Sequence, residues 1–343
     1  MVIDRVFSDM ICSLKNRIKN TFKNLPILCY MHEILFRIFY GEIYYKKVCK
    51  RYAKDAVFYV MPCYGTGDIF IVTDFLQNCD NVKNNAVLLT ISNKTKYIAE
   101  INKFNKNIQI ISERIMRGLM CMIRFYGEVN FPNIRIMHFD PYHMYTAIAK
   151  NMAGYKSTTF YQLYDFCVFN KIGEKKLTLN SKPSKPDSYK RYCFLKEKSI
   201  LFFPKASTIQ PIDDEFWEKL AQRLIDNGMT VCTNIVDNEV PIKNTIGVYI
   251  PYSDLMNVAN NSGIVVGIRS GIFDIIAQLD SHKFIIYPIE GEKRFGVGGF
   301  FDFFNFSNCQ FSKNIYEYRV DKRNSDQIID NIFQDIMKIH LSL

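Results

Sequence analysis

The feature that most constrains the fold is a repeated alternation of short apolar runs with longer helical segments, which begins at Asp55. The first series of runs covers residues 56–61, 86–90, 108–111 and 134–137. These runs are rich in β-branched and aromatic residues, and the segments between them are long enough for crossover helices. Such spacing is typical of βαβ units in a parallel sheet. We therefore predict a Rossmann-like domain over residues 55–180.

The alternation restarts after a polar, proline-containing stretch that we interpret as a linker over residues 181–198. Strands are expected near 199–204, 229–233, 264–268 and 283–288, with helices near 213–227, 254–260 and 272–279. This predicts a second Rossmann-like domain over 199–325 and a C-terminal helix over 326–343. The fold class is therefore α/β, with two Rossmann-like domains facing each other across a cleft.

The first 54 residues are strongly basic. Eleven Lys and Arg against four Asp and Glu give this segment +7 of the formal +10 charge of the chain. Interleaved Ile, Leu, Phe and Tyr predict a basic amphipathic helical extension over 1–54, packed on the N-terminal domain. An anionic membrane surface is a candidate partner, and a solvated helical face is the alternative. Nucleic acid is not expected, because no recognised binding motif accompanies the charge.

Composition indicates a folded protein, with 48% hydrophobic and 23% charged residues. The ten cysteines are scattered singly with no CxxC pair, which disfavours a zinc site or a disulfide framework and favours a reducing compartment. No secretory signal and no apolar run of about 18 residues is seen. We predict a cytoplasmic location, with peripheral attachment to the inner face of the cell membrane as an option.

A glycine-containing turn, residues 62–68, follows the first predicted strand and precedes a helix. Gly67 would let a ligand approach the backbone closely. A dinucleotide fingerprint needs a further glycine where Phe70 stands, which disfavours a dehydrogenase. Asp68 is a candidate general base for a sugar hydroxyl, and a helix N-cap is its structural alternative.

A second motif, Lys205 with Ser207 and Thr208, follows the first strand of the second half. A lysine and two hydroxyls at a strand-to-helix junction form a plausible cradle for a diphosphate. Ordinary surface loops contain the same residues.

A third motif delivers Arg269, Ser270 and Gly271 to the start of an apolar helix. Backbone N–H groups, a hydroxyl and a guanidinium would converge there on an anion such as a nucleotide diphosphate. The structural alternative is an ion pair between Arg269 and Asp274.

Metal chemistry is not expected. His138 and His143 flank Asp140, but histidines near strand ends are more often structural than metal ligands. The sequence also lacks an Asp-x-Asp pair of the kind that holds a metal–diphosphate complex. The cationic residues of the second half could neutralise the diphosphate instead.

Taken together, these motifs resemble bacterial heptosyltransferase-like enzymes of the GT-B kind. The resemblance rests on 67–69, on Lys205 with its two hydroxyls, and on the stretch 250–274. It implies that Asp68 is the base and that Lys205 with Ser207 or Thr208 contacts the phosphates of the donor. It also implies an inverting, metal-independent transfer from a nucleotide sugar to a cell-envelope glycan or lipid-linked acceptor, as in capsule or lipopolysaccharide synthesis.

The third motif departs from that family. Arg269-Ser270-Gly271 stands where the family has Asp-Thr-Gly, and Asp274 takes the place of a histidine. The departure removes an acid, adds a cation and weakens the case for an ADP-heptose donor. An arginine at this turn is reminiscent of fucosyltransferase-like GT-B proteins.

Two other functions remain open. A catalytically inactive nucleotide- or glycan-binding partner of a biosynthetic complex would keep the Arg269 site but need no base. A GT-B-shaped sugar epimerase would need a histidine and paired carboxylates, which the sequence pattern does not bring together.

Overall fold

A computed structural model describes residues 26–82, 85–138, 159–172, 179, 199–207, 209–236, 238–289, 299–306, 309 and 312–342. Contacts divide the chain into two units, each discontinuous in sequence. Unit 1 is Met1–Pro62, Lys83–Ser92 and Lys106–Met137, and unit 2 is Cys63–Val82, Asn93–Asn105 and His138–Leu343. The predicted linker 181–198 and residues 1–25 of the basic segment lie outside the described residues, so the predicted domain boundaries stay predictions.

The sheet of unit 1 consists of four parallel strands in the order β3-β2-β1-β4. The strands are β1 (Val57–Met61), β2 (Ala86–Thr90), β3 (Asn107–Ile110) and β4 (Ile134–Ile136). All four were predicted from the sequence. Because β1 and β2 are buried almost throughout, their apolar runs are continuous rather than alternating.

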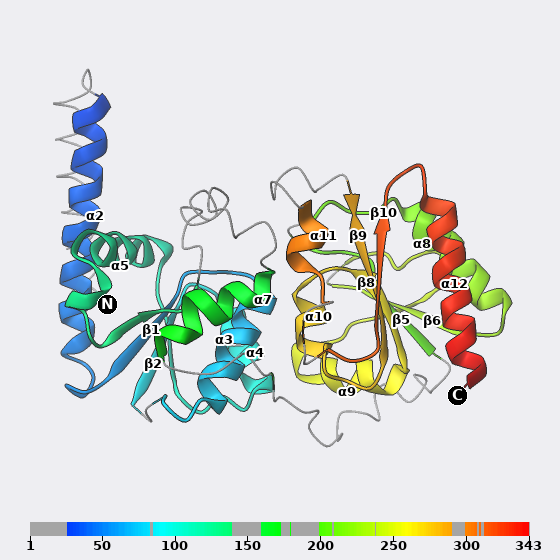
Figure 1. The fold of residues 1–343 in the computed structure, drawn as a ribbon, viewed down its shortest axis with the longest axis horizontal. Coiled ribbons are helices and arrows are strands. Elements are labelled where there is room, and N and C mark those ends of the chain that lie inside the picture. Colours follow the sequence, from blue (N-terminus) through cyan, green and yellow to red (C-terminus); the bar gives the residue numbers. More distant parts are fainter. Residues whose placement is uncertain are drawn as a thin grey trace. The chain divides into compact units, whose positions relative to one another are not determined.

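Two helices of unit 1, α2 (Pro26–Cys49) and α5 (Glu113–Tyr126), pack side by side (Figure 1). They approach so closely that a Cβ at Gly41 would overlap the backbone carbonyl of Gly118. Tyr45 also donates a hydrogen bond of 2.6 Å from its hydroxyl to Asn133. The short 3-10 helix η1 (Glu128–Asn130) follows α5. The basic extension is therefore helical over 26–49 and packed within this unit.

Unit 2 begins with α3 (Thr66–Asn78) and α4 (Lys94–Ile101). Asn102 joins these helices, since its side-chain amide donates to Phe70 O at 3.0 Å and to Thr73 Oγ1 at 2.6 Å. A continuous helical segment follows, made of α7 (Phe160–Leu163), the π-turn η4 (Tyr164–Val168) and the 3-10 turn η5 (Phe169–Ile172). Phe169 stacks on Phe75 of α3 at 3.7 Å between ring centroids, which fixes this segment against α3.

The sheet of unit 2 has six parallel strands in the order β10-β9-β8-β5-β6-β7. Four were predicted: β5 (Ser199–Phe203), β6 (Thr230–Asn234), β8 (Ile264–Ile268) and β9 (His282–Pro288). The two edge strands, β7 (Ile246–Val248) and β10 (Ile315–Val320), were not. The helices are α8 (Asp214–Asp226), α9 (Tyr252–Ser262), α10 (Gly271–Ile276), α11 (Gly299–Phe304) and α12 (Ser325–Ser342). Both units are thus α/β with parallel sheets, as predicted.

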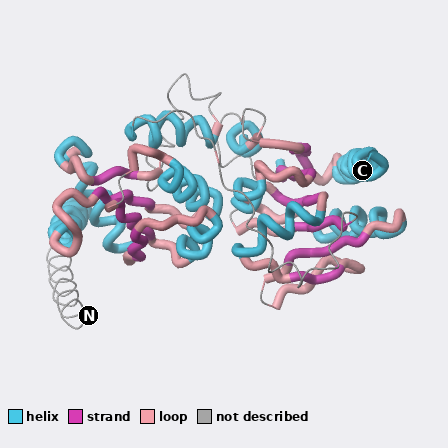
Figure 2. Tube along the Cα trace, turned by 90° about the horizontal axis from the view of Figure 1, so that it is seen from below, coloured by secondary structure: helices cyan, strands magenta, loops and turns pink. Residues whose placement is uncertain are grey.

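Helices cover both faces of this second sheet (Figure 2). On one face, alternate strand residues such as Phe202 and Val266 join a core cluster with Trp217 of α8 and Ile332 of α12. On the other face, Gly267 lies against Phe273 of α10. A Cβ at Gly267 would come within 2.6 Å of Phe203 O on the neighbouring strand β5 and 3.1 Å of the Phe273 ring, so the close packing of β8 against β5 and α10 requires glycine there.

One buried lysine makes the stability of this sheet depend on pH. Lys283 of β9 is fully buried, its Nζ donates to Leu279 O at 2.5 Å, and burial lowers its pKa to about 7. The nearby charges are Asp280, which raises this pKa, and Lys313, which lowers it. Between pH 7 and about 10.5 the unfolded state holds a proton that the folded state lacks, so this group makes stability rise with pH.

We expect Lys283→Met to raise the free energy of unfolding most at pH 7 and progressively less toward pH 9. The wild-type curve should climb toward that of the variant by about 1.4 kcal/mol per pH unit, the value for a single proton. Urea unfolding at pH 7, 8 and 9 measures this difference. Lys322→Met is the matched control, because Lys322 is exposed and is not among the charges that act on Lys283, so the pH dependence should stay that of the wild type. Parallel curves for wild type and Lys283→Met would contradict the assignment.

Within the described part of the chain, no helix combines the length and apolar character needed to cross a membrane.

Candidate active site

The order of the strands marks one point in each sheet where ligands of open α/β proteins commonly bind. At this point the connections that leave two adjacent strands go to opposite faces of the sheet, and a crevice forms at the carboxyl ends of these strands. In the first sheet these strands are β1 and β4, which lead into Cys63 and His138. In the second sheet they are β5 and β8, which lead into Lys205 and Arg269. The three motifs singled out in the sequence therefore follow strands at these two points.

The first turns of α3 and α10 meet at two glycines. A Cβ at Gly271 would overlap the backbone nitrogen of Gly67, and a Cβ at Gly67 would overlap the carboxylate of Asp274. The contact is continued by Thr66 and Tyr252, whose hydroxyl oxygens are 3.2 Å apart. Glycine at 67 and 271 is thus needed for backbone contact between two predicted motifs.

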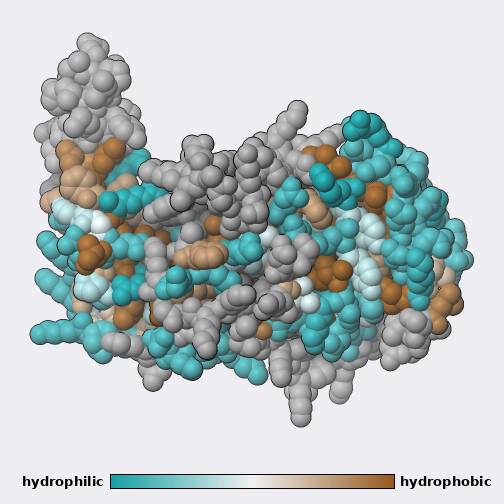
Figure 3. Space-filling view, in the orientation of Figure 1, coloured by the Kyte–Doolittle hydropathy of each residue, from teal (hydrophilic) through white to brown (hydrophobic). Residues whose placement is uncertain are grey.

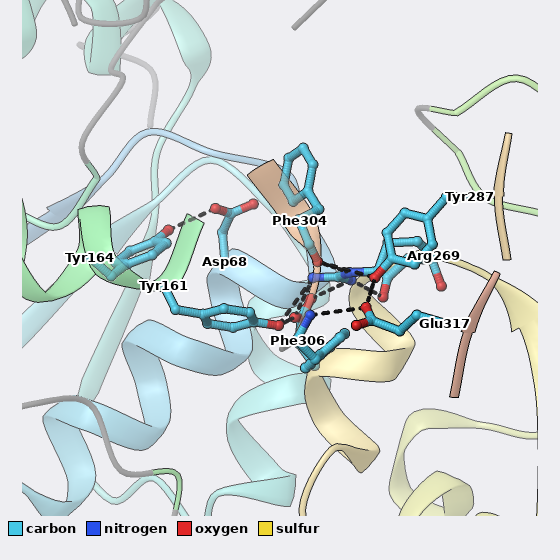
Figure 4. A network of polar contacts seen from close by, with 10 residues as sticks. Asp68, Tyr161, Tyr164, Arg269, Tyr287, Phe304, Phe306 and Glu317 are labelled. Carbon is cyan, nitrogen blue, oxygen red and sulfur yellow. Dashed lines mark hydrogen bonds and ion pairs between the residues drawn. The ribbon is translucent and has the colours of Figure 1, made fainter. Parts of the chain in front are cut away.

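Asp68 lies in the first turn of α3, whose N-cap is Gly65, so its structural alternative as the N-cap is not realised. The hydroxyl of Tyr164 donates to its Oδ1 at 2.7 Å (Figure 4). His138 Nε2 lies 3.4 Å from the same oxygen. A Cβ at Gly65 would overlap Oδ2, so the carboxylate lies directly over that glycine. With 19% of its side chain exposed, Asp68 is oriented by protein groups and still reachable from solvent.

Arg269 and Asp274 form a buried ion pair, the structural alternative that the sequence left open. Their side chains are 3% exposed, and Nη2 to Oδ1 and Nη1 to Oδ2 measure 2.7 and 3.1 Å. The guanidinium also donates from Nε to Phe304 O at 3.0 Å, from Nη1 to Ser270 O at 2.6 Å and from Nη2 to the Tyr161 hydroxyl at 3.1 Å. Every guanidinium nitrogen therefore already donates to a protein oxygen.

This ion pair belongs to a larger network (Figure 4). Phe306 lies under the guanidinium, at 4.7 Å from its carbon to the ring centroid. Glu317 accepts from the Tyr287 hydroxyl at 2.5 Å and from the backbone nitrogen of Phe306 at 3.0 Å. The network thereby connects the turn after β8 to α11, β9 and β10.

Burial governs the ionisation of the groups around both carboxylates. It raises the pKa values of Tyr161, Tyr164 and Cys63, with the adjacent aspartates adding to the effect, so these groups are protonated near neutral pH. Burial also raises the pKa of Asp274, while the Arg269 guanidinium opposes that rise. Because arginine does not lose its proton in proteins, we take the pair as ionic.

Two tyrosines that the sequence analysis did not select connect the candidate residues. Tyr161 donates to Asp274, and Tyr164, three positions later in the same helical segment, donates to Asp68. Two tyrosines on one face of this helical segment thus hold both carboxylates, that of the candidate base Asp68 and that of Asp274. The spacing Tyr-x-x-Tyr after a helix start is visible in the sequence, but it does not indicate which residues the two hydroxyls contact.

The second motif is more exposed to solvent than the other two. Lys205 is exposed and pairs with Glu239 at 3.1 Å from Nζ to Oε1. Ser207 is exposed, and Thr208 lies outside the described residues. At the neighbouring strand end, Ser270 Oγ is buried and has no hydrogen-bond partner in the part of the chain that the structure describes. The two motifs share an edge of the sheet because β5 pairs with β8, Phe203 opposite Gly267.

Of the two histidines that the sequence singled out, the structure describes His138, which lies next to Asp68. Asp140 and His143 lie outside the described residues. Cys63, Asp68 and His138 each present one atom within 4.8 Å of the others, a set that metal ions bind in proteins.

Comparisons with known proteins show the fold. No protein-family model matches the sequence, and no curated protein matches it. Among solved structures, E. coli ADP-heptose lipopolysaccharide heptosyltransferase II aligns with a TM-score of 0.55 at 11% identity, over 83% of this chain and 99% of that one. E. coli heptosyltransferase WaaC with ADP aligns at 0.45 and 12%, over 82% and 99%. A glycosyl transferase family 9 structure from Veillonella parvula aligns at 0.47 and 10%, over 80% and 88%. The resemblance stated from the motifs is thus confirmed at the level of the fold, which is that of heptosyltransferase II.

Proposed function

We propose that this protein is a glycosyltransferase that moves a sugar from a nucleotide-activated donor to a cell-envelope glycan or a lipid-linked acceptor. The fold is that of heptosyltransferase II, a protein whose name gives ADP-heptose and lipopolysaccharide as its chemistry. The transfer is proposed to be inverting and to need no metal. A single observation carries the proposal: Asp68 is a partly exposed carboxylate oriented by Tyr164 where β1 meets β4.

In the proposed reaction, Asp68 accepts the proton of the acceptor hydroxyl as that oxygen attacks the anomeric carbon of the donor. A base must lie within hydrogen-bond reach of the proton that it takes, and partial exposure of Asp68 allows this. The bond between the anomeric carbon and the diphosphate breaks, and the diphosphate leaves with the electron pair. Opposite-face attack inverts the anomeric centre.

On the donor side, Lys205 is proposed to contact the phosphates, together with Ser207, Thr208 and the backbone of Gly271. Lys205 is exposed at the switch point of the second sheet, and its ion pair with Glu239 is a surface pair that costs little to exchange. Arg269 is proposed to hold the turn that presents Ser270. Direct contact of Arg269 with a phosphate stays a prediction, and it would require the guanidinium to exchange an existing bond.

We expect Lys205→Ala to weaken nucleoside diphosphate binding by about 1.5–3 kcal/mol, the range for a hydrogen bond to a charged group. Thermal-shift titration with GDP, UDP, ADP and CMP identifies the nucleotide, because a ligand at 100 times its Kd stabilises the folded state by about 2.7 kcal/mol. Lys219→Ala is the matched control, since Lys219 is also a half-exposed lysine paired with acidic side chains. Equal loss in both variants, or no nucleotide shift in the wild type, would overturn the donor site.

A sugar epimerase is the second candidate, favoured by one observation. The structure places His138 beside Asp68, a histidine–carboxylate pairing that the sequence did not indicate. Incubation with nucleotide sugars and no acceptor separates the two reactions. An epimerised nucleotide sugar supports the epimerase, whereas transfer only on addition of an acceptor supports the transferase.

Anionic membrane is proposed as a docking surface through α2. Figure 3 shows apolar residues gathered on this helix, where Leu35 and Phe39 are 54% and 56% exposed. Lys46 and Lys47 lie exposed in its last turn. Each Lys or Arg close to anionic lipid contributes about 1 kcal/mol to the binding free energy, and exposed apolar side chains add to it by inserting into the membrane interface.

We expect the protein to sediment with anionic vesicles, and this binding should weaken as the salt concentration rises. The double variant Lys46→Glu/Lys47→Glu should bind at least tenfold more weakly. Two lost contacts of about 1 kcal/mol each exceed the 1.4 kcal/mol that corresponds to a tenfold change in affinity. The control Lys94→Glu/Lys96→Glu makes the same charge change on exposed lysines of α4. Equal binding to neutral and anionic vesicles would contradict this docking.

A further inference from the structure

Three different metal-binding side chains meet at the switch point of the first sheet. Cys63 comes from the end of β1, Asp68 from the first turn of α3, and His138 from the end of β4. The thiol, one carboxylate oxygen and one ring nitrogen lie within 4.8 Å of one another. His138 Nε2 and Asp68 Oδ1 are 3.4 Å apart, a separation that two ligands of one ion can have when metal–ligand bonds are about 2.0–2.3 Å. A small side-chain movement then brings the Cys63 sulfur to the same ion.

The donor set is specific in its chemistry. Sulfur and imidazole nitrogen favour a borderline or soft cation such as Zn²⁺, and they disfavour Mg²⁺ and Ca²⁺, which prefer all-oxygen sites. The residues are well buried yet accessible, since Cys63 is 8% exposed and the side chains of His138 and Asp68 are 14% and 19% exposed.

A surrounding group orients one of the ligands. Tyr164 donates to Asp68 Oδ1 at 2.7 Å, and its ring packs edge-on against His138 at 6.1 Å between centroids. Tyr164 itself is fully buried. Hydrogen bonds to a ligating carboxylate are the usual outer support of a protein metal site.

We propose that Cys63, Asp68 and His138 form a binding site for a divalent cation of the Zn²⁺ class, and that occupation of this site inhibits the enzyme. The inhibitory part rests on the proposed function: a carboxylate that coordinates a cation no longer accepts the proton of the acceptor hydroxyl. The cation is therefore a regulator that competes with the base role of Asp68, and the transfer itself proceeds without it.

Cobalt provides a test that needs no sugar. Titration of Co²⁺ into reduced, metal-free full-length protein should produce the near-ultraviolet band of thiolate-to-cobalt charge transfer, because the Cys63 thiol releases its proton to solvent as the sulfur–cobalt bond forms. Zn²⁺ should abolish the band, and excess Mg²⁺ should not. The band should vanish in Cys63→Ser. It should persist in Cys309→Ser, the matched control, because Cys309 is also 8% exposed. Tyr164→Phe should weaken cobalt binding about 10–100-fold, as loss of an outer hydrogen bond to a metal ligand does.

A band that survives in Cys63→Ser, or no band in the wild type, would overturn the site, and both results leave the role of Asp68 as a base untouched. A second measurement tests the consequence. Zn²⁺ should inhibit transfer by the wild type and should do so much less in Cys63→Ser, with EDTA restoring full turnover. Equal inhibition of both proteins would overturn the regulatory part of the proposal.

Discussion

Asp68→Asn is expected to lower turnover by about 10²–10⁴-fold, the usual contribution of a general base. Donor affinity should change little, because the side chain keeps its shape, its position over Gly65 and its hydrogen bond from Tyr164. The loss should therefore appear in kcat and, by the same factor, in kcat/KM, as is typical of an interaction made only in the transition state. Steady-state transfer assays with the nucleotide sugar identified by thermal shift measure both constants.

Asp80→Asn is the matched control, an exposed aspartate just after the C-terminus of α3 that should retain full turnover. Activity of the wild type should also survive EDTA. Near-full turnover of Asp68→Asn would place the base elsewhere, with Asp140, His143 and Asp165 as the next residues to test. Absence of turnover in the wild type with every nucleotide sugar that it binds would favour the inactive binding partner, for which an Asp68 held by Tyr164 is purely structural. A strict requirement for Mg²⁺ or Mn²⁺ would overturn the metal-independent scheme.

The central strands were predictable because burial on both faces leaves continuous apolar runs. β5 and β8 are buried at every position, so their sequences are continuous apolar runs and do not alternate between apolar and polar residues. The edge strands lacked this signal. β7 has three residues, two of them exposed, and β10 carries Glu317 and Arg319 among half-buried tyrosines. An edge strand needs less apolar surface, so sequence pattern identifies it poorly.

The position of the candidate site was predictable for a related reason. Ligand positions in these folds follow strand order, and the motifs after β1, β5 and β8 stand at strand ends in the sequence itself. Their partners were not predictable. Tyr164 reaches Asp68 across 96 positions and Tyr161 reaches Asp274 across 113. Such contacts depend on tertiary packing, which local periodicity does not encode.

Arg269 was selected as a ligand-binding cation, and its environment instead predicts a large effect on stability. Arg269→Ala is expected to lower the free energy of unfolding by about 3–5 kcal/mol, because it leaves the Asp274 carboxylate buried without its cation. The carbonyl oxygens of Ser270 and Phe304 would each lose one donor as well. Urea unfolding at neutral pH measures the loss.

Arg319→Ala is the control for an arginine that packs on phenylalanine, since Arg319 lies 5.4 Å over the ring of Phe301 but is exposed. It should cost at most about 1 kcal/mol. The double variant Arg269→Met/Asp274→Leu should recover most of the loss, because replacing both members of a buried ion pair with apolar side chains is often neutral or stabilising. A change below about 0.5 kcal/mol in Arg269→Ala, the size of an ordinary surface substitution, would contradict the buried pair. The nucleotide affinity of the folded double variant then shows whether Arg269 also contacts the ligand. If affinity is retained, Arg269 acts only by holding the turn after β8. If the binding free energy falls by about 1.5–3 kcal/mol, Arg269 also contacts the phosphates.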